Sequence, residues 1–342
     1  MEETARIIAL AGLLQDIGTF CCRAGGRNKQ GRGMLAACLP EGQSYEALLQ
    51  CIGCHHQAIG VKHIKHKEHI AYLIYAAADI TAGAGRRPAA EYSGGAGRAA
   101  AGAREYQQLW RRLEASLWQT DFSACTVEQV LAVMRSVAAG VPYSLADTGA
   151  GNISLYDHSR LTAALAVCLY RYFAAAGISD YRYWCAGASK TRCRTVPAFL
   201  LLGGELAGNG CYMQAISAIR EQPALQAYCL DKLLTVFGLS RAHLLYADNA
   251  RFCVLAPNVP EVTGLLAMAA ATINGDLHRQ FGAGLCLALV RQEADACALM
   301  NGGWLATPPP QAAQLAARFF NVQSDQQVRE QQPEMWTMPD HG

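Results

Sequence analysis

The sequence predicts an α+β protein in which an all-helical region comes first and a mixed α/β domain follows. Two observations lead to this prediction. Apolar residues recur with helical periodicity over residues 1–175, whereas residues 196–292 alternate short apolar runs with longer helical patterns. At 342 residues the chain is long enough for two domains, each with a core of its own. Residues 176–196 are expected to join the two parts.

The α/β domain is predicted to begin with the apolar run 199–202, which stops at Gly203-Gly204-Glu205. A helical pattern then covers residues 207–237, and two β-type runs follow at 242–246 and 251–255. A second helical pattern covers residues 261–281, and the run 285–290 closes the set. The order β-α-β-β-α-β predicts one ferredoxin-like unit, the palm domain, over residues 196–295.

The helical region is predicted to begin with an amphipathic helix over residues 4–20. Asp16 is placed at the C-terminal end of this helix, where the helix dipole disfavours a carboxylate unless a cation or metal accompanies it. A basic, glycine-rich loop is expected at residues 23–32 and a mobile Gly/Ala/Arg-rich loop at residues 83–104. Further helices are predicted at residues 45–52, 70–79, 104–118, 126–139 and 161–173.

These patterns divide the chain into four parts. A helical domain is expected at residues 1–120 and a helical linker region at 121–195, followed by the palm domain at 196–295. Residues 296–342 are expected to hold a helix at 311–320 and a disordered tail from Ser324.

Composition indicates an ordered chain and limits its partners. Hydrophobic residues make up 52% of the chain and charged residues 16%, which excludes a disordered protein. The formal net charge of +2 gives no overall nucleic-acid signature, so RNA would be bound by a local patch or through partners. The N-terminus fits neither a secretory signal nor a spanning helix. We therefore expect a cytoplasmic protein with no membrane partner, whose 14 cysteines are reduced and mostly buried.

Four candidate metal ligands lie on or beside successive helices: Asp16, His55, His56 and Asp79. A helical bundle with inward His and Asp side chains is how a metal-dependent phosphohydrolase holds its ions and activates water. Such a site usually begins with a His-Asp dipeptide, and here that place reads Gln15-Asp16. A glutamine carbonyl is a weaker ligand for a transition metal than an imidazole. We therefore favour a relict site kept for packing, with a divalent metal as the one candidate cofactor.

Two histidine-containing patterns have simpler interpretations. Cys51-x-x-Cys54-His55 matches the c-type haem attachment pattern, which we reject because the chain carries no export signal; a zinc site is the alternative. His63, His66 and His69 alternate with lysines, and a solvated helix face is favoured over a phosphate-contacting patch.

Three further motifs raise the question of catalysis. Contiguous residues cannot form a relay, so Asp157-His158-Ser159 is rejected as a triad, and a helix cap by Ser154 or Asp157 explains it. Gly203, Gly204 and Glu205 are placed at a strand end, where a palm would hold metal and nucleotide, although Glu205 is a single carboxylate. Turn chemistry explains Asp248-Asn249.

Several of these motifs, in this order, resemble the large subunit of type III CRISPR effector complexes, the polymerase/cyclase-type subunit. The matching segments are residues 13–20 (LLQDIGTF), His55-His56, 78–83 (ADITAG), 153–164 (ISLYDHSRLTAA), 199–205 (FLLLGGE) and 245–258 (LYADNARFCVLAPN). Order and spacing agree over about residues 5–295, and the SLYDHSR block is the most specific piece. The resemblance implies a permuted HD nuclease domain followed by a palm.

Departures from the family pattern decide the expected function. Gln15 replaces the histidine of the family's HD motif, and no Gly-Gly-Asp-Asp loop, which makes cyclic oligoadenylates from ATP in the family, occurs in this sequence. Where the family has Gly-Gly-Asp, this chain has Gly203-Gly204-Glu205. We therefore expect a reduced, catalytically degenerate large subunit lacking the second palm, with a degenerate HD-like domain at residues 1–120.

The resemblance also implies partners and alternatives. The expected role is to cap the 5′-tag end of the crRNA by docking on crRNA-loaded backbone subunits, with crRNA and target RNA bound mostly through the complex. A small helical subunit is a further candidate partner. Two alternatives stay open, a metal-dependent single-stranded DNA nuclease and one half of a split cyclic-oligoadenylate synthase.

Overall fold

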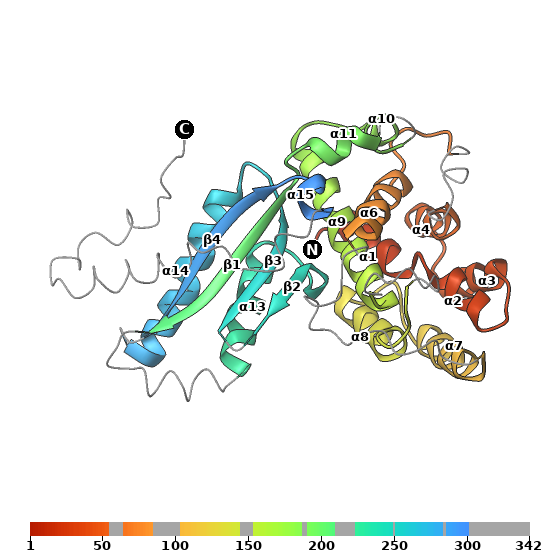
Figure 1. The fold of residues 1–342 in the computed structure, drawn as a ribbon, viewed down its shortest axis with the longest axis horizontal. Helices are drawn as coiled ribbons and strands as arrows, with labels where there is room; N and C mark the ends of the chain where they lie inside the picture. Colours follow the sequence, from red (N-terminus) through yellow and green to blue (C-terminus); the bar gives the residue numbers. More distant parts are fainter. Residues whose placement is uncertain are drawn as a thin grey trace.

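The computed structural model describes residues 1–54, 64–84, 103–143, 153–186, 190–208, 223–248, 250–282 and 285–300. A helical part is followed by a small antiparallel sheet covered by helices on one face, as the sequence predicts (Figure 1). His55, His56, His63 and the predicted helix at 311–320 with its tail lie outside the described residues.

The first predicted helix, residues 4–20, is in fact two helices. Helix α1 spans Glu3–Leu14 and α2 spans Ile17–Arg23. Asp16 has non-helical dihedral angles (φ −87°, ψ 5°) and its carbonyl oxygen accepts the first hydrogen bond of α2, from the amide of Phe20 at 3.0 Å. Asp16 therefore lies at the N-terminus of a helix, where the dipole favours a carboxylate. Asp16 also directly follows Gln15, the C-cap of α1, so its predicted place at a helix C-terminus holds for α1, whereas the single helix over residues 4–20 was wrong.

The other predicted helices of the first part are all found, but the one predicted at residues 161–173 begins earlier, at Leu155, and two short helices, Tyr181–Cys185 and Lys190–Thr195, lie in the segment expected to join the two parts. Residues 28–38, partly assigned to a loop, form helix α3. The elements are α3 (Asn28–Cys38), α4 (Gln43–Cys54), α6 (Ala71–Ala84), α7 (Ala103–Trp118), α8 (Val127–Ala138), α9 (Leu155–Ala175), α10 (Tyr181–Cys185) and α11 (Lys190–Thr195). Thr126 and Gln129 form a capping box at the start of α8.

Helix α9 is the central helix of this part, and α1 packs directly against it. The contact is close because Gly12 has no side chain: a Cβ at that position would lie 2.5 Å from the Cα of Ala163. Helices α8 and α9, which the sequence assigned to a linker region, share one continuous core with α1, α4 and α6. The segment Glu3–Arg23 is long and apolar enough to cross a membrane, but 83% of its most apolar window is buried, so packing in this core accounts for its hydropathy.

The second part contains the sheet, whose strands are β1 (Phe199–Gly208), β2 (Leu244–Ala247), β3 (Arg251–Pro257) and β4 (Leu285–Ala294). The strand order is β2-β3-β1-β4 and every pairing is antiparallel. Helices α13 (Pro223–Val236) and α14 (Val262–Phe281) lie between successive strands in the chain, which gives the β-α-β-β-α-β order that the sequence predicts (Figure 1).

The two faces of the sheet belong to two different cores. Leu200, Leu202 and Val254 point to α13 and α14, whereas Leu201 and Leu255 belong to the core of the helical part. This alternation follows from the two-residue period of a strand. A short 3₁₀ helix, η4 (Arg241–His243), and helix α15 (Ala296–Met300) also contact the helical part.

Two arginines of α9 fasten the helical part to the sheet domain. The guanidinium of Arg160 donates to the carbonyl oxygens of Ala242 and Leu244, the former at 3.2 Å. That of Arg171 donates to the carbonyl oxygens of Phe237 and Gly238 at 2.7 and 2.9 Å. Helix α9 thus serves both parts of the molecule.

Candidate functional site

A buried polar centre lies where α1 and α2 meet α9. Oδ2 of Asp16 is 3.7 Å from Nε2 of His158, and both side chains are fully buried. The ring of Tyr143 stacks on the imidazole of His158, with centroids 3.6 Å apart and ring planes within 14°. A carboxylate beside an imidazole in a water-free environment interacts strongly, because the local dielectric is low.

The chain segments around His158 hold this centre in place. The amide of Tyr143 donates to the carbonyl oxygen of Ile153 at 2.9 Å, and the amide of Leu155 donates to that of Val141 at 2.7 Å. Arg23, in the last turn of α2, donates to the carbonyl oxygens of Pro142 and Tyr143. These bonds tie α2 and the start of α9 to one short extended segment, so Tyr143 is fixed over the histidine.

The SLYDHSR block acts through several of its side chains at once. The hydroxyl of Ser154 accepts a hydrogen bond from the amide of Asp157 at 3.0 Å and donates to the carboxylate of Asp157 at 2.7 Å, which caps α9 as predicted. Asp157 also forms an ion pair with Arg160 at 3.5 Å. His158 reaches the buried centre, and Arg160 reaches the sheet domain.

Other buried polar groups surround Asp16 and His158. The side chains of Gln15 and Ser159 are fully buried, and within the described part of the chain neither has a hydrogen-bond partner for its polar atoms. Thr162 donates to the hydroxyl of Thr81 at 3.3 Å, and Thr81 donates to the carbonyl oxygen of Ala77 at 2.9 Å. Gln15 is therefore a buried amide.

Asp79 contributes to a different cluster. Its carboxylate pairs with the guanidinium of Arg194 on α11, and both side chains are partly exposed. Beside this ion pair lie the buried thiols of Cys185 and Cys193. The hydrogen bond from the Cys185 thiol lowers the pKa of Cys193. Asp16 and Asp79, predicted to share a metal, thus have different side-chain neighbours, His158 and Arg194.

The donor set does not fit a divalent metal as far as the structure describes it. Over residues 1–54, 64–84 and the later described ranges, no group of three or more His, Cys, Asp or Glu side chains converges. His55 and His56 lie outside those ranges. The thiol of Cys51 donates to the carbonyl oxygen of Ala47 at 3.1 Å, as a structural cysteine does. The metal assignment remains a prediction.

Gly203, Gly204 and Glu205 do not end a strand. Strand β1 continues to Gly208, and Gly204 pairs with Phe252 on β3 and with Leu289 on β4. A side chain at Gly204 would overlap the ring of Phe252, which explains the glycine by packing. Nucleotide binding at these residues was predicted from a strand end that the structure does not show here. It remains a prediction.

Asp248 is a turn residue, as predicted. Its Oδ1 accepts hydrogen bonds from the amides of Ala250 and Arg251 at 2.9 and 2.7 Å, and its Oδ2 accepts from the guanidinium of Arg251 at 2.9 Å. Burial raises the pKa of Asp248, but hydrogen bonds from Tyr246, Ala250 and Arg251 outweigh this and hold the pKa below its ordinary value. Asn249 lies outside the described residues.

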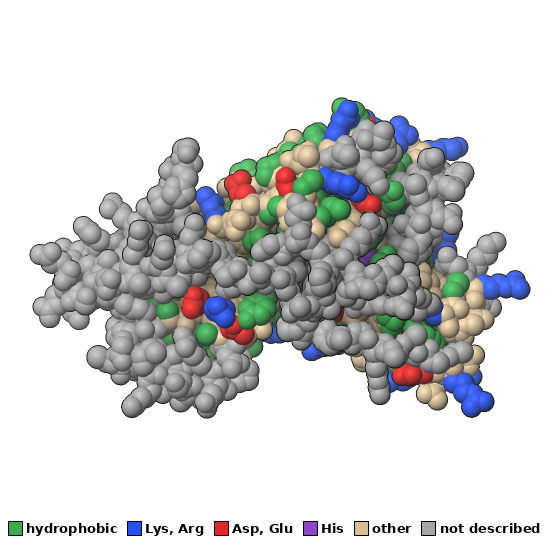
Figure 2. Space-filling model, in the orientation of Figure 1, with side chains coloured by type: hydrophobic (Ala, Val, Ile, Leu, Met, Phe, Trp, Pro, Cys, Tyr) green, Lys and Arg blue, Asp and Glu red, His purple; other side chains and the backbone are tan. Residues whose placement is uncertain are grey.

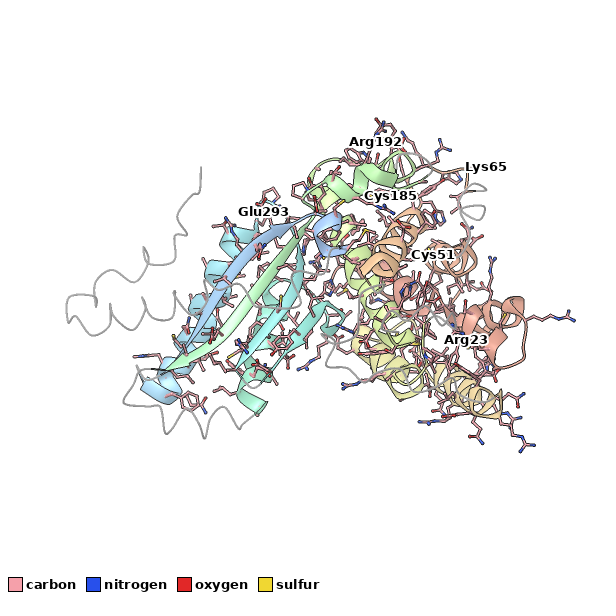
Figure 3. All side chains as sticks on the ribbon, viewed as in Figure 1. Arg23, Cys51, Lys65, Cys185, Arg192 and Glu293 are labelled. Atoms are coloured by element: carbon pink, nitrogen blue, oxygen red, sulfur yellow. The ribbon has the colours of Figure 1, made fainter. Side chains whose placement is uncertain are left out.

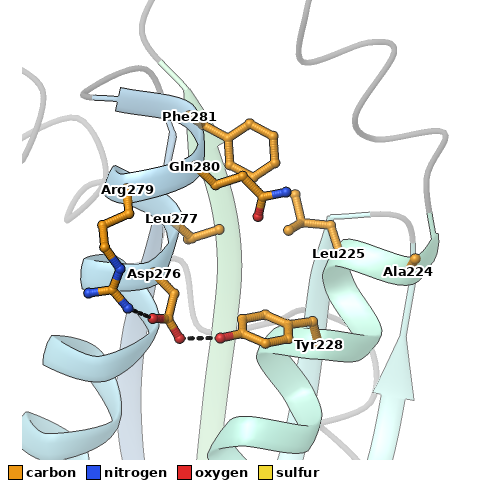
Figure 4. A pocket seen from close by; sticks show the side chains of 8 residues that line it. All are labelled: Ala224, Leu225, Tyr228, Asp276, Leu277, Arg279, Gln280 and Phe281. Atoms are coloured by element: carbon orange, nitrogen blue, oxygen red, sulfur yellow. Dashed lines mark hydrogen bonds and ion pairs between the residues drawn. The ribbon is translucent and has the colours of Figure 1, made fainter.

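A pocket of about 560 Å³ opens between α13 and α14 (Figure 4). Its polar groups are engaged with one another: the hydroxyl of Tyr228 donates to Asp276, and Asp276 also pairs with Arg279. The bond to Asp276 raises the pKa of Tyr228 to about 12. The rest of the lining includes Leu225, Leu277 and Phe281, and this pocket shows no convergent catalytic groups.

Sequence reasoning missed His158. The residue was considered only with its neighbours in the chain, whereas its partner is 142 positions away. The available signal was its helical spacing, because His158 lies on the same face of α9 as the buried residues Leu155, Thr162 and Leu165.

Comparison with known proteins gives one consistent result. A family model described as Csm1 subunit domain B matches residues 223–336. The single-strand-specific deoxyribonuclease Cas10/Csm1 (subtype III-A) of Thermococcus onnurineus is 28% identical over 194 residues, covering 54% of this chain and 22% of that protein. The Mycobacterium tuberculosis protein of the same description is 28% identical over 163 residues, covering 45% of this chain and 20% of that protein.

Solved structures agree in fold. A Csm1-Csm4 cassette in complex with pppApA contains a chain with a TM-score of 0.63 at 23% identity, covering 94% of this chain and 49% of that one. Csm1 of T. onnurineus gives a TM-score of 0.59 at 23% identity, covering 86% of this chain and 45% of that one. This chain therefore spans about half the length of the chains in those structures. The sequence alignments cover about a fifth of the length of the two curated relatives.

Proposed function

We propose that this chain, which is similar to the Cas10/Csm1 proteins of subtype III-A, serves a type III CRISPR effector complex as a catalytically degenerate large subunit. In this proposal residues 1–120 belong to a degenerate HD-like domain and residues 196–295 form a ferredoxin-like palm. The subunit caps the 5′-tag end of the crRNA and docks on the backbone subunits. Its role is architectural.

One observation carries the proposal that the nuclease centre is lost. Asp16 and Asp79, the two carboxylates that a shared metal site would need, are engaged with different partners, the imidazole of His158 and the guanidinium of Arg194. Gln15 at the position of the HD histidine is fully buried and adds no imidazole. Metal-assisted hydrolysis needs at least three protein ligands and an open coordination position for water, and among the described residues, which do not include His55 and His56, no group of three such ligands converges.

The palm supports the same conclusion. Glu205 lies in the middle of a strand that is paired on both sides, opposite Arg251. A side chain at Gly204 would overlap the ring of Phe252, and Gly203 and Gly204 both pair with β3 and β4, so the backbone there is not available as a phosphate-binding loop. Two-metal phosphoryl transfer needs further carboxylates near Glu205, and none of the described strands supplies one at this register.

A co-purification experiment tests the architectural role. The chain is co-expressed with a crRNA and the backbone subunits of a type III-A complex, among them a Csm4-type subunit, and the complex is isolated through a tagged backbone subunit. We expect this chain in the complex together with protection of the crRNA 5′-tag from nuclease digestion. A complex that assembles fully without the chain, or a chain that never co-purifies, refutes the proposal. A small helical subunit in the same preparation would extend the list of partners.

A second experiment separates this role from the nuclease alternative, which the closeness of Asp16 to His158 favours. The purified chain is incubated with single-stranded DNA and Mn²⁺ or Ni²⁺, beside Asp16→Ala and the control Asp231→Ala, whose carboxylate is exposed on α13. We expect no cleavage in any of the three. Cleavage that is lost in Asp16→Ala and kept in Asp231→Ala refutes the degenerate assignment. ATP turnover that requires a separate second palm would favour the split synthase.

A further inference from the structure

Two segments far apart in the sequence form one surface at an end of the helical part. Residues 64–70 precede α6, and residues 180–186 and 190–195 contain α10 and α11. The amide of Arg182 donates to the carbonyl oxygen of Lys67 at 3.0 Å, which fixes the two segments to each other. Helix α10 also packs on α6 (Figure 1). We call this region the α10–α11 surface.

The α10–α11 surface concentrates positive charge. The side chains of Lys65, Lys67, Arg182 and Arg192 are exposed, and within the described residues none of them forms an ion pair. Lys65 and Arg192 lie at this end of the molecule in Figure 3, and basic side chains gather there in Figure 2.

Two acidic residues on the surface leave an excess of positive charge. Glu68 is exposed and Asp180 is half-buried. Oδ1 of Asp180 accepts a hydrogen bond from the amide of Tyr183 at 2.9 Å and so caps α10. The four exposed cations named above and these two acids sum to a charge of +2 (4 − 2), the same as the formal net charge of the whole chain. The local excess is therefore as large as that of the entire protein.

An aromatic ring lies among these cations. Tyr183 is 51% exposed, and the Cζ of Arg192 lies 3.9 Å from the centroid of the Tyr183 ring. Tyr183 meets Trp184 edge to face at 6.0 Å, and Trp184 contacts the buried ring of Phe173 at 5.8 Å. The exposed ring is thus held in place by the core while it contributes little to it.

Stacked aromatic and guanidinium groups surrounded by cations are the chemistry that binds single-stranded nucleic acid. Bases stack on aromatic faces and on arginine planes, and cations contact the phosphates. An acidic peptide would use the cations but would have no need of the ring. We propose that the α10–α11 surface binds single-stranded nucleic acid, with Lys65, Lys67 and Arg182 at the phosphates and one base stacked on the Tyr183–Arg192 pair.

Fluorescence anisotropy of the purified full chain tests this proposal without any partner subunit, so it is independent of the proposed docking. The probes are labelled single-stranded RNA and DNA of roughly 15 nucleotides, within the span of single-strand binding surfaces, and a blunt duplex of the same length. The variants are R182Q/R192Q, Y183A and Y183F. The control is R111Q/R112Q, which removes two exposed charges from α7. Thermal melting of each variant confirms folding.

We expect both single strands to bind more tightly than the duplex. R182Q/R192Q should lower the slope of log K against log salt by about 0.7, because it removes the one phosphate contact of Arg182 and each phosphate contact on a single strand contributes about 0.7. Y183A should weaken binding roughly 5- to 150-fold, the loss of one stacked base, and Y183F should bind like the wild type. The control pair should leave affinity unchanged.

Four outcomes would overturn the proposal. The first two are a lack of saturable binding at low salt and an equal loss of affinity in R111Q/R112Q and R182Q/R192Q. The other two are wild-type affinity in Y183A and displacement of the labelled strand by polyglutamate as readily as by unlabelled single strand. A difference between RNA and DNA would identify which sugar the surface accepts and would support the proposal in either direction.

Discussion

Gly12→Ala should separate α1 from α9 and thereby disturb the buried Asp16–His158 centre. The added Cβ would lie 2.5 Å from the Cα and 2.8 Å from the backbone nitrogen of Ala163. Carbon atoms in contact are ordinarily about 3.5–4.0 Å apart, so the two helices must move by roughly 1 Å. Since the clashing atoms are backbone, no side-chain rotation can relieve the overlap.

The magnitude follows from two opposing effects. Overpacking of a core costs about 1–3 kcal/mol, and a backbone clash belongs to the upper half of that range. Replacing a helical glycine by alanine returns about 0.5–1 kcal/mol. The net loss in the free energy of unfolding is then about 1–2.5 kcal/mol. For a unit of about 200 residues, this lowers Tm by roughly 2–10 °C.

Differential scanning calorimetry of Gly12→Ala and a matched control checks this reasoning. The control is Gly264→Ala on α14, where no atom lies within 4 Å of the added Cβ. The control should be stabilised by about 0.5–1 kcal/mol, so the same substitution changes Tm in opposite directions at the two sites. If Gly12→Ala is neutral or stabilising, the close approach of α1 and α9 does not exist.

Three further predictions concern buried polar groups and the link between the two parts. Gln15→Met should raise the free energy of unfolding by about 1–3 kcal/mol, because it replaces a buried amide that has no partner among the described residues with an apolar chain of similar length; a lower Tm would contradict this. Burial lowers the pKa of His243 to about 3, so its stabilising effect is present above pH 6.5 and lost at about 1.4 kcal/mol per pH unit below it. The free energy of unfolding, measured by chemical denaturation, should therefore fall less steeply from pH 7 to pH 4 in His243→Gln than in the wild type. An unchanged slope would refute the low pKa of His243. Arg160→Met and Arg171→Met together remove the hydrogen bonds from α9 to the sheet domain, and limited proteolysis should then cut the joining segment 176–196 faster than in either single variant.

Local sequence signals identified several elements correctly because the deciding interactions are local. Thr126 begins α8 through a capping box with Gln129, three residues away. Ser154 caps α9 through the amide of Asp157, and Asp248 forms a turn through amides two and three residues on. The order of strands and helices after Phe199 follows in the same way from the change between periods of 2 and 3.6 residues.

Errors arose where distant segments decide the outcome. Gly203 and Gly204 end an apolar run in the sequence, yet β1 continues through them because β3 and β4 pair with it on both sides. The break between α1 and α2 at Asp16 coincides with the approach of His158 from α9. No pattern within a window of a few residues contains either partner.

The sequence by itself determined the class of fold, the order of elements, the local caps and turns, and the resemblance to the type III large subunits. Each of these depends on the spacing of residues along the chain. The tertiary structure alone decided that Asp16 faces His158, that Asp79 faces Arg194, and that Arg182 and Lys67 join one surface. Those pairs form because α9 packs against α1 and α6 while α10 packs against α6, so their geometry depends on helix packing across more than a hundred residues.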